Sequence, residues 1–261
     1  MAGFIDIACN FTHESFKKNL ETVIADAENV GVEKFVLLCA SLKDLNLIQA
    51  IQSQCPEKYF ISAGIHPHHA NEIMDINFLE LLEKLRSINP HAIGETGLDY
   101  FRNISPPEIQ RKAFQMHVEI AKELTLPLYL HQRDAHDDFV KIIKENIENF
   151  PKFVVHCFTG TQVELDKYLE LGGYIGLTGW ICDAKRNIDL RKSIKNIPIE
   201  RMMIETDSPY LIPKNLLNKP KNNINEPKYL PHIANEICEL IGVEIEEFKS
   251  VTSKNAINFF T

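Results

Sequence analysis

The sequence has no long apolar run and no leader-like segment at its start. No stretch reaches the roughly 18 consecutive apolar residues that a membrane-spanning helix needs, and Met1–Asp6 has no basic region followed by a long apolar one. There is also no tract rich in Ser, Gly or Pro that would mark a linker between domains. These absences predict a cytoplasmic protein in which residues 1–261 form a single domain.

Cysteine is sparse and is not spaced for metal or disulfide chemistry. None of the six cysteines belongs to a C-x-x-C pair, which argues against a zinc ribbon and a disulfide framework. Cys157 directly follows His156, but neighbouring residues of a strand point to opposite sides. The sequence therefore favours a structural role for Cys157 over a catalytic thiol.

Positive charge is in the minority. The 28 Lys and Arg residues against 36 Asp and Glu residues give a formal net charge of −8. This balance argues against a protein that coats nucleic acid through a general positive field, but not against a nuclease with positive charge only near its cleft. Basic residues gather between residues 185 and 195 and again between 214 and 228. Two interpretations stay open there: a substrate-facing patch or a solvated helix face.

Short strand-like runs alternate with amphipathic segments almost from end to end. The predicted strands are Phe4–Ala8, Lys34–Cys39, Tyr59–Ala63, Ala92–Glu95, Leu128–His131, Phe153–His156, Tyr174–Leu177 and Met202–Thr206. The predicted helical segments are 14–29, 43–54, 76–87, 107–124, 134–147, 162–171 and 188–195, followed by 228–241 and 244–259. Eight such units in a chain of this length predict an α/β fold, a TIM-like (β/α)8 barrel with extra C-terminal helices. The long loop from Pro209 to Pro231 is expected to form part of the active-site rim.

Four polar side chains stand where predicted strands end. Glu95, His131, His156 and Asp207 follow short apolar runs on separate strands. In such a barrel the carboxyl ends of the strands meet at one mouth, where catalytic groups gather. Imidazoles and carboxylates together suit Mn, Zn, Fe or Co, and can hold Mg when waters complete the shell. The pattern predicts a metal-dependent hydrolase.

Five short blocks surround these residues. They read G-I-H-P-H at 64–68, G-E-T-G-L-D at 94–99, L-H-Q-R-D-A at 130–135, V-H-C-F-T-G at 155–160 and E-T-D-S-P-Y-L at 205–211. In order and spacing they resemble the TatD family of metal-dependent deoxyribonucleases, over practically the whole chain. The resemblance implies a barrel of the amidohydrolase type that cuts phosphodiester bonds in DNA with one or two divalent ions.

The resemblance also implies roles for the four polar residues. Glu95 would bridge the ions when two are bound, and His131 and His156 would bind the same ion as Glu95. Asp207 would lie beside the attacking water as a ligand or general base, which makes Glu95 and Asp207 the catalytic residues. Chemically, a cation lowers the pKa of a water and neutralises charge in the transition state, while a carboxylate accepts the proton.

One departure from the family pattern concerns the first strand. Many members carry an H-x-H pair there, but this chain has Ala8 and Asn10. His13 is expected to start the following helix and not to replace a ligand. This variant resembles the TatD subgroup itself, which implies a Mg-dependent 3′–5′ exonuclease of single-stranded DNA and RNA. We expect one firm ion on Glu95, His131 and His156, Mg2+ with Mn2+ or Zn2+ as alternatives, and a second ion recruited by substrate phosphate.

Other residues near the predicted mouth suit substrate binding. His66 and His68 flank a rigid proline turn after the third strand, and Arg133 lies two residues beyond His131. We expect these three side chains to contact substrate phosphate, with a surface-loop role as the alternative for the histidines. Gly94 and Gly97 are expected to permit tight turns.

Two other functions stay open at this point. The same barrel and ligands could hydrolyse a small amide, a lactone or the ester of a mischarged tRNA, because an activated water attacks carbonyls as well as phosphates. A binding protein that lost catalysis with its H-x-H pair is the third possibility. For the leading hypothesis we expect single-stranded DNA or RNA as the partner, no membrane contact and a monomer.

Overall fold

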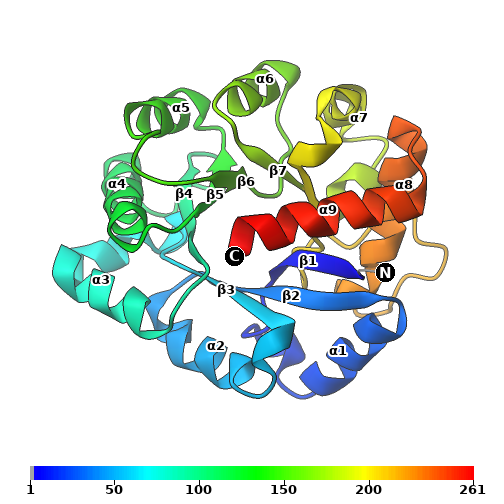
Figure 1. The fold of residues 1–261 in the computed structure, drawn as a ribbon, viewed down its shortest axis with the longest axis horizontal. Helices are drawn as coiled ribbons and strands as arrows, with labels where there is room; N and C mark the ends of the chain where they lie inside the picture. Colours follow the sequence, from blue (N-terminus) through cyan, green and yellow to red (C-terminus); the bar gives the residue numbers. More distant parts are fainter. Residues whose placement is uncertain (1–2) are drawn as a thin grey trace.

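A computed structural model describes residues 3–261, and within them eight parallel strands form one sheet in the order β1 to β8. Each strand pairs with the next one along the chain, and the helices surround the sheet (Figure 1). The strands are β1 (Phe4–Cys9), β2 (Val32–Cys39), β3 (Tyr59–Ala63), β4 (Ala92–Asp99), β5 (Leu128–Arg133), β6 (Phe153–Val155), β7 (Tyr174–Leu177) and β8 (Met202–Ile204). The predicted (β/α)8 barrel is confirmed.

Helices follow the strands as predicted. The α-helices are α1 (Leu20–Asn29), α2 (Leu45–Gln52), α3 (Phe78–Ser87), α4 (Pro107–Leu124), α5 (His136–Glu145), α6 (Gln162–Glu170), α7 (Ile188–Ser193), α8 (Leu230–Ile241) and α9 (Ile245–Phe260). Short 3-10 helices are η1 (Glu14–Phe16), η2 (Leu42–Asp44), η3 (Pro56–Lys58), η4 (Pro67–Asp75), η5 (Gly179–Cys182), η6 (Ile194–Asn196), η7 (Ile199–Arg201) and η8 (Pro227–Tyr229). Within residues 3–261, none of the helices combines the length and the apolarity needed to cross a membrane.

One difference from the predicted elements, in the fourth strand, affects the site directly. The sequence pattern ends this strand at Glu95, but β4 continues to Asp99. The register between β4 and β5 shifts between Ile93 and Thr96, which is the irregularity of a β-bulge. Glu95 therefore projects from within β4, and His131 projects from within β5, which continues to Arg133. The prediction that these two residues end their strands is wrong.

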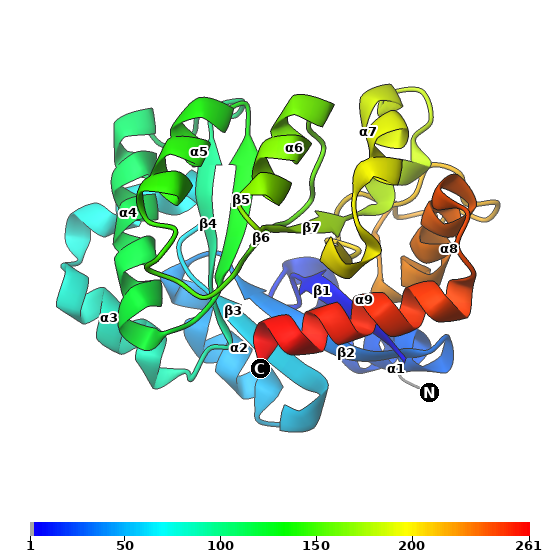
Figure 2. The same cartoon turned by 45° about the horizontal axis from the view of Figure 1, so that its top comes forward.

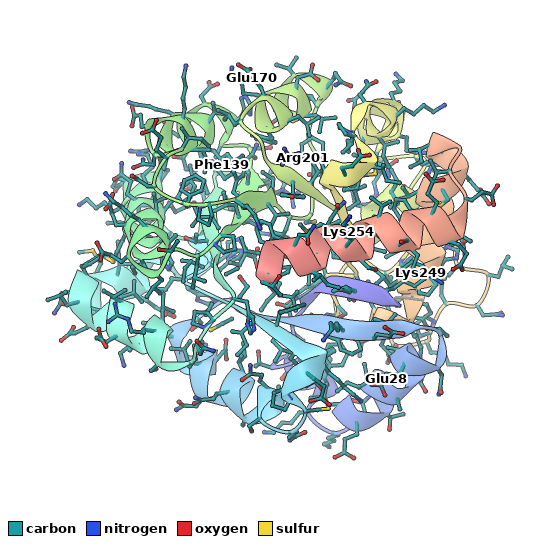
Figure 3. The ribbon with its side chains drawn as sticks, viewed as in Figure 1. Glu28, Phe139, Glu170, Arg201, Lys249 and Lys254 are labelled. Atoms are coloured by element: carbon teal, nitrogen blue, oxygen red, sulfur yellow. The ribbon has the colours of Figure 1, made fainter. Side chains whose placement is uncertain are left out.

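Helix α9 closes the barrel at the amino ends of its strands. Phe259 and Phe260, at the end of α9, pack with Phe60 of β3 and Tyr129 of β5, and both phenylalanines are buried. Figures 1 and 2 show α9 lying across this end of the barrel. Lys254 projects from the opposite, solvent-facing side of α9 (Figure 3). The carboxyl ends of the strands are left as the open mouth.

The first and last strands are joined by a side chain as well as by backbone. Cys9 and Ser208 form an isolated bridge, and the buried carboxylate of Asp6 accepts hydrogen bonds from Thr206 N at 2.9 Å and Thr206 Oγ1 at 2.5 Å. Asn225 donates its side-chain amide to Thr206 O at 2.8 Å. These contacts hold the chain just before Asp207 in one position.

Candidate active site

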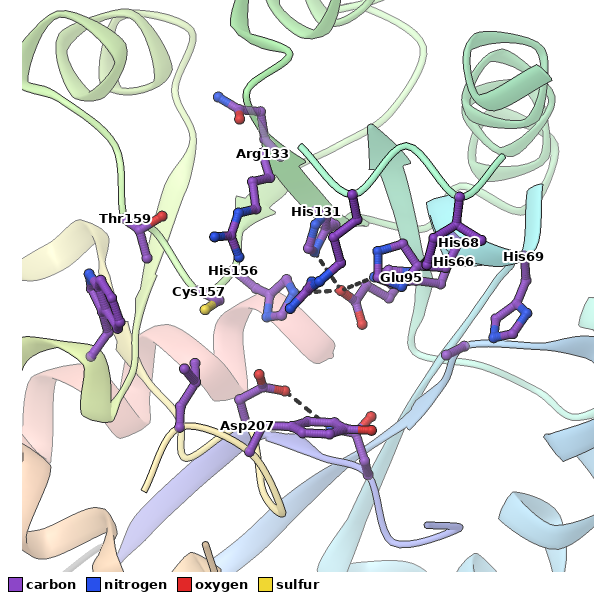
Figure 4. A pocket seen from close by; sticks show the side chains of 18 residues that line it. His66, His68, His69, Glu95, His131, Arg133, His156, Cys157, Thr159 and Asp207 are labelled. Carbon is purple, nitrogen blue, oxygen red and sulfur yellow. Dashed lines mark hydrogen bonds and ion pairs between the residues drawn. The ribbon is translucent and has the colours of Figure 1, made fainter. Parts of the chain in front are cut away.

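A cavity of about 510 Å³ lies at the carboxyl ends of the strands (Figure 4). All four predicted metal ligands line it, and so do all three predicted substrate-binding residues. They are Glu95, His131, His156 and Asp207, with His66, His68 and Arg133. The structure brings the predicted set together at one mouth.

Three imidazoles surround one oxygen of Glu95. Oε1 of Glu95 lies 2.7 Å from Nε2 of His156, 3.0 Å from Nδ1 of His131 and 3.2 Å from Nε2 of His66. Burial alone would raise the pKa of the Glu95 carboxyl, but these histidines outweigh burial and hold its pKa well below the usual range. Glu95 is therefore a buried anion at neutral pH.

Gly94 and Gly97 allow β4 to approach β5 closely beside Glu95. Their φ angles are +140° and +135°, a region that side chains rarely adopt. A Cβ on Gly94 would lie 1.9 Å from Tyr129 O, and one on Gly97 would lie 2.0 Å from His131 O. The predicted tight turns are wrong, since both glycines lie within β4. Their role is to bring Glu95 next to His131.

His66 differs from His131 and His156 in the partner of the ring nitrogen that faces away from Glu95. Nδ1 of His66 accepts a hydrogen bond from His68 N at 3.0 Å, and burial lowers the pKa of His66 to about 4. A neutral imidazole has one donor and one acceptor, so Nε2 of His66 carries the proton. By distance His66 groups with Glu95 and His131 as a possible metal site. The tautomer argues instead for a hydrogen-bond donor.

His131 and His156 keep a second nitrogen that is buried and without a hydrogen-bond partner in residues 3–261. These atoms are Nε2 of His131 and Nδ1 of His156. The opposite nitrogens, Nδ1 of His131 and Nε2 of His156, face Glu95 Oε1 and offer with that carboxylate the nitrogen and oxygen donors that divalent metals bind. The donor set therefore fits a divalent ion.

Buried carboxylates lie beside both of these histidines. Asp99 Oδ2 lies 3.5 Å from Nε2 of His131, and Glu205 Oε2 lies 3.5 Å from Nδ1 of His156. Asp99 also holds Nε2 of His68 at 2.7 Å, while Glu205 accepts a hydrogen bond from the Tyr129 hydroxyl at 2.9 Å. Carboxylates in such places orient imidazoles and raise their basicity.

Asp207 faces the Glu95 cluster from the other side of the cavity (Figure 4). Its Oδ1 accepts a hydrogen bond from the Asn10 amide at 3.1 Å. Burial, opposed by His156 but aided by the charges of Glu95 and Glu205, raises the pKa of Asp207 to about 7. A carboxyl with this pKa can exchange a proton near neutral pH.

The first-strand residues that replace the H-x-H pair have other roles. Ala8 is buried in the barrel interior, and the side-chain amide of Asn10 donates hydrogen bonds to Asp207 Oδ1 and to Ser208 O. His13 accepts a hydrogen bond from Ser15 N at 3.1 Å and caps η1. His13 thus starts the short 3-10 helix η1, whereas the α-helix predicted for 14–29 begins only at Leu20.

Comparison with known proteins identifies the family. The profile of the family described as TatD related DNase matches residues 5–261. The chain belongs to this family. A protein of Pectobacterium atrosepticum named 3′-5′ ssDNA/RNA exonuclease TatD is 38% identical over 255 residues, covering 98% of both chains. A protein of the same name from Edwardsiella piscicida is 39% identical over 260 residues, again with 98% of both chains covered.

Solved structures of TatD proteins have the same fold. A TatD family hydrolase from Entamoeba histolytica superposes with a TM-score of 0.87 at 29% identity, covering 98% of this chain and 97% of the other. The TatD homologue YJJV from Escherichia coli superposes with a TM-score of 0.86 at 25% identity, with the same coverage. The TatD resemblance and the barrel of the metal-dependent hydrolases are thus confirmed together.

Sequence reasoning for this TatD chain missed the supporting carboxylates. The sequence predicts for Asp99 only a role in supporting the loop after the fourth strand, which its hydrogen bond from Arg102 N at 2.8 Å agrees with. It gives Glu205 no role beside Asp207. A signal was present for Glu205, since an acidic residue directly after the apolar run 202–204 must be buried with partners. Nothing local marks Asp99, whose partner His68 is 31 positions away.

Ion pairs show in part whether the basic residues between 185 and 228 form a substrate-facing patch or a solvated helix face. Arg191 pairs with Glu236 at 2.6 Å, and Lys228 pairs with Asp26 at 3.0 Å. Arg186 pairs with Asp183 at 2.6 Å but lies at a cavity wall.

The loop from Pro209 to Pro231 contributes Tyr210 and Leu211 to the lining of the active-site cavity, as predicted.

Proposed function

We propose that this protein is a metal-dependent nuclease that removes nucleotides from the 3′ end of single-stranded DNA and RNA. The observation that carries the proposal is the cluster of His131, His156 and Glu95, facing Asp207 across a cavity at the barrel mouth. The names of the TatD relatives support the direction of attack and the single-stranded substrate.

In this proposal Glu95, His131 and His156 hold one divalent ion, with Mg2+ as the physiological metal and Mn2+ or Zn2+ as substitutes. When bound, the ion supplies a water of lowered pKa and neutralises charge on the reacting phosphate. Asp99 and Glu205 keep the two imidazoles oriented toward it.

Asp207 accepts the proton of the attacking water. Its pKa of about 7 and its hydrogen bond from Asn10 suit that role, because the carboxylate is fixed in position and can take up a proton near neutral pH. The leaving group is the 3′ oxygen of the penultimate nucleotide. The released product is a 5′-mononucleotide.

His66, His68 and Arg133 bind phosphate oxygens. The imidazole of His66 is neutral and carries its one proton on Nε2, so this nitrogen can donate a hydrogen bond. Asp99 holds His68 in place through Nε2 of His68. The guanidinium of Arg133 lies over the Phe101 ring at the cavity wall, and its N–H groups remain available for an anion.

We also propose that a second ion joins only with substrate phosphate, because Ala8 and the hydrogen-bonded Asn10 offer no ligand pair. The proposed enzyme is a monomer, since one chain supplies every residue of the cluster. The single domain and the cytoplasmic location expected from the sequence stay predictions.

The test is digestion of a single-stranded oligonucleotide labelled at its 5′ end, with Mg2+ and Mn2+ compared against chelator. Wild type should give a metal-dependent ladder that shortens from the 3′ end, and Glu95→Gln should give none. Glu170→Gln makes the same change on the surface of α6 and should cleave like wild type (Figure 3). Absence of cleavage with every metal would refute the proposal, and ester hydrolysis that leaves the polynucleotide intact would favour a deacylase.

A further inference from the structure

A second cavity adjoins the candidate active site. Its volume is about 330 Å³, and it shares Gln132, Arg133, Thr159 and Trp180 with the first cavity as lining residues. This volume lies at the lower end of the roughly 300–1,000 Å³ found for small-molecule sites. The cavity has room for one group of the size of a base, directly beside the place where phosphate would be cut.

Two pairs of a guanidinium and an aromatic ring line this second cavity. The guanidinium carbon of Arg133 lies 4.1 Å from the ring centroid of Phe101, and that of Arg186 lies 4.7 Å from the ring of Trp180. Asp183 fixes Arg186 through its Nε at 2.6 Å. Phe101 is 59% exposed although it is a large apolar residue. Flat aromatic and guanidinium surfaces are the platforms on which bases stack.

The charges of the second cavity disfavour phosphate. Its lining contains the guanidinium groups of Arg133 and Arg186 against the carboxylates of Asp134, Glu164 and Asp189. A phosphate would therefore meet more negative than positive charge. A neutral planar group avoids this repulsion and still gains the stacking surfaces.

We propose that the second cavity binds the base of the penultimate nucleotide, on the 5′ side of the bond that is cut. This proposal rests on the proposed nuclease function. With the 3′-terminal nucleotide in the first cavity, the strand continues past the wall that both cavities share at Arg133 and Trp180. The next base along the strand is the planar group that the substrate delivers there.

Binding can be measured without cleavage, because Trp180 is the only tryptophan of the chain and lines both cavities. Its fluorescence is followed during titration with thymidine 5′-monophosphate and with a dinucleotide that carries a cleavage-resistant phosphorothioate link. The dinucleotide should bind more tightly, and Phe101→Ala should remove about 5- to 100-fold of its affinity. Phe101→Tyr keeps a ring and should keep the affinity. Leu79→Ala, at an exposed site on α3, is the matched control.

A cleavage experiment separates the second cavity from the first. The methyl ester of thymidine 5′-monophosphate has a terminal nucleotide and an alkoxide leaving group but neither a penultimate base nor any other planar group in its place. Phe101→Ala should lower kcat/KM about 5- to 100-fold more on an oligonucleotide than on this ester. Equal losses on both substrates, or equal binding of mono- and dinucleotide, would overturn the proposal. If wild type cleaves neither substrate, the nuclease function fails, and the fluorescence titration still decides whether the cavity takes a second base.

Discussion

Three histidines that all touch Glu95 are made chemically different by their second nitrogen. For His66 that nitrogen accepts a backbone hydrogen bond, while for His131 and His156 it lies near a buried carboxylate. A second partner decides which ring nitrogen carries the proton. Being a histidine therefore does not by itself tell whether the residue binds the metal or donates a hydrogen bond.

The tautomer of His66 leads to a prediction about metal binding. His66→Asn keeps an acceptor for His68 N but is too short to reach Glu95 or a phosphate. It should leave Mn2+ affinity near the wild-type value and lower kcat/KM by about 10- to 100-fold, as expected for the loss of a hydrogen bond to a charged group. The matched change His131→Asn should weaken Mn2+ binding by more than about 10-fold. Calorimetric titration with Mn2+ compares the two, and equal weakening would show that His66 is a ligand.

The close approach at Gly94 leads to a prediction about stability. Gly94→Ala places a Cβ against Tyr129 O at a φ of +140°, so β4 must move. The free energy of unfolding should fall by about 3 kcal/mol or more, the upper range for overpacking. Gly31 also has a positive φ, +87°, but no atom within 4 Å of an added Cβ, so Gly31→Ala should cost only about 1–2 kcal/mol. Urea unfolding measures both, and equal losses would contradict the close-approach argument.

At the scale of elements, helix α4 holds the segment after β3 in place. His117 on α4 accepts a hydrogen bond from Ile65 N at 3.0 Å, and its other ring nitrogen contacts Ala113 O at 2.7 Å. The residue after Ile65 is His66, so this tether positions one wall of the site. His117 is fully buried, and burial lowers its pKa to about 4.

This tether predicts a dependence of stability on pH. The folded pKa of His117, about 4, lies below the ordinary value of 6.5, so the unfolded chain binds the proton more readily. The contribution of the neutral His117 to the free energy of unfolding is therefore fully present above pH 6.5 and is lost as the pH falls toward 4. His117→Gln should cost about 1–3 kcal/mol at pH 7, and the difference from wild type should shrink as pH falls.

The control for this experiment is another buried tether that does not titrate. Asn255 on α9 donates to Ile199 O and to Met202 O, each at 2.8 Å. Asn255→Ala should lower stability by a similar amount at every pH between 4 and 7. Thermal unfolding of the three proteins across this range makes the comparison. A constant difference between His117→Gln and wild type would contradict the assigned role of His117.

At the scale of the whole molecule, the apolar groups that stabilise the barrel and the polar groups of the active site lie at opposite ends of it. The interior is filled by apolar side chains and closed by α9 at the amino ends of the strands. The buried charges of the site, Glu95, Asp99 and Glu205, gather at the other end. An ion that binds only the folded protein stabilises it, so an ion held at this mouth should stabilise the whole protein.

A divalent ion is therefore expected to raise the melting temperature. At a free Mn2+ concentration of 100 times Kd, the gain should be about 2.7 kcal/mol for one site. Chelator should reverse the gain together with the activity, and Glu95→Gln should show neither effect. Differential scanning calorimetry at increasing Mn2+ measures this. A melting temperature that does not respond to metal would contradict the single-ion site.

The order of strands and helices could be predicted from local patterns. Tyr59–Ala63 and Tyr174–Leu177 match β3 and β7 residue for residue, and α4 matches its predicted range. Buried strands are short apolar runs, and helices show a period near 3.6, so neighbouring residues carry both signals. The four polar residues of the site were found from their places at the ends of the predicted strands.

Only the tertiary structure decided which partners these residues have. The bulge within β4 depends on the contact between Gly94 and Tyr129, and the hold of Asp6 on Thr206 joins positions 200 residues apart. The proton on His66 and the placement of Asp99 depend on turns and neighbours in the same way. Local sequence determines what a residue can offer, such as a lone pair, a charge or an apolar face. Distances between strands determine what it meets, and that requires the closed barrel.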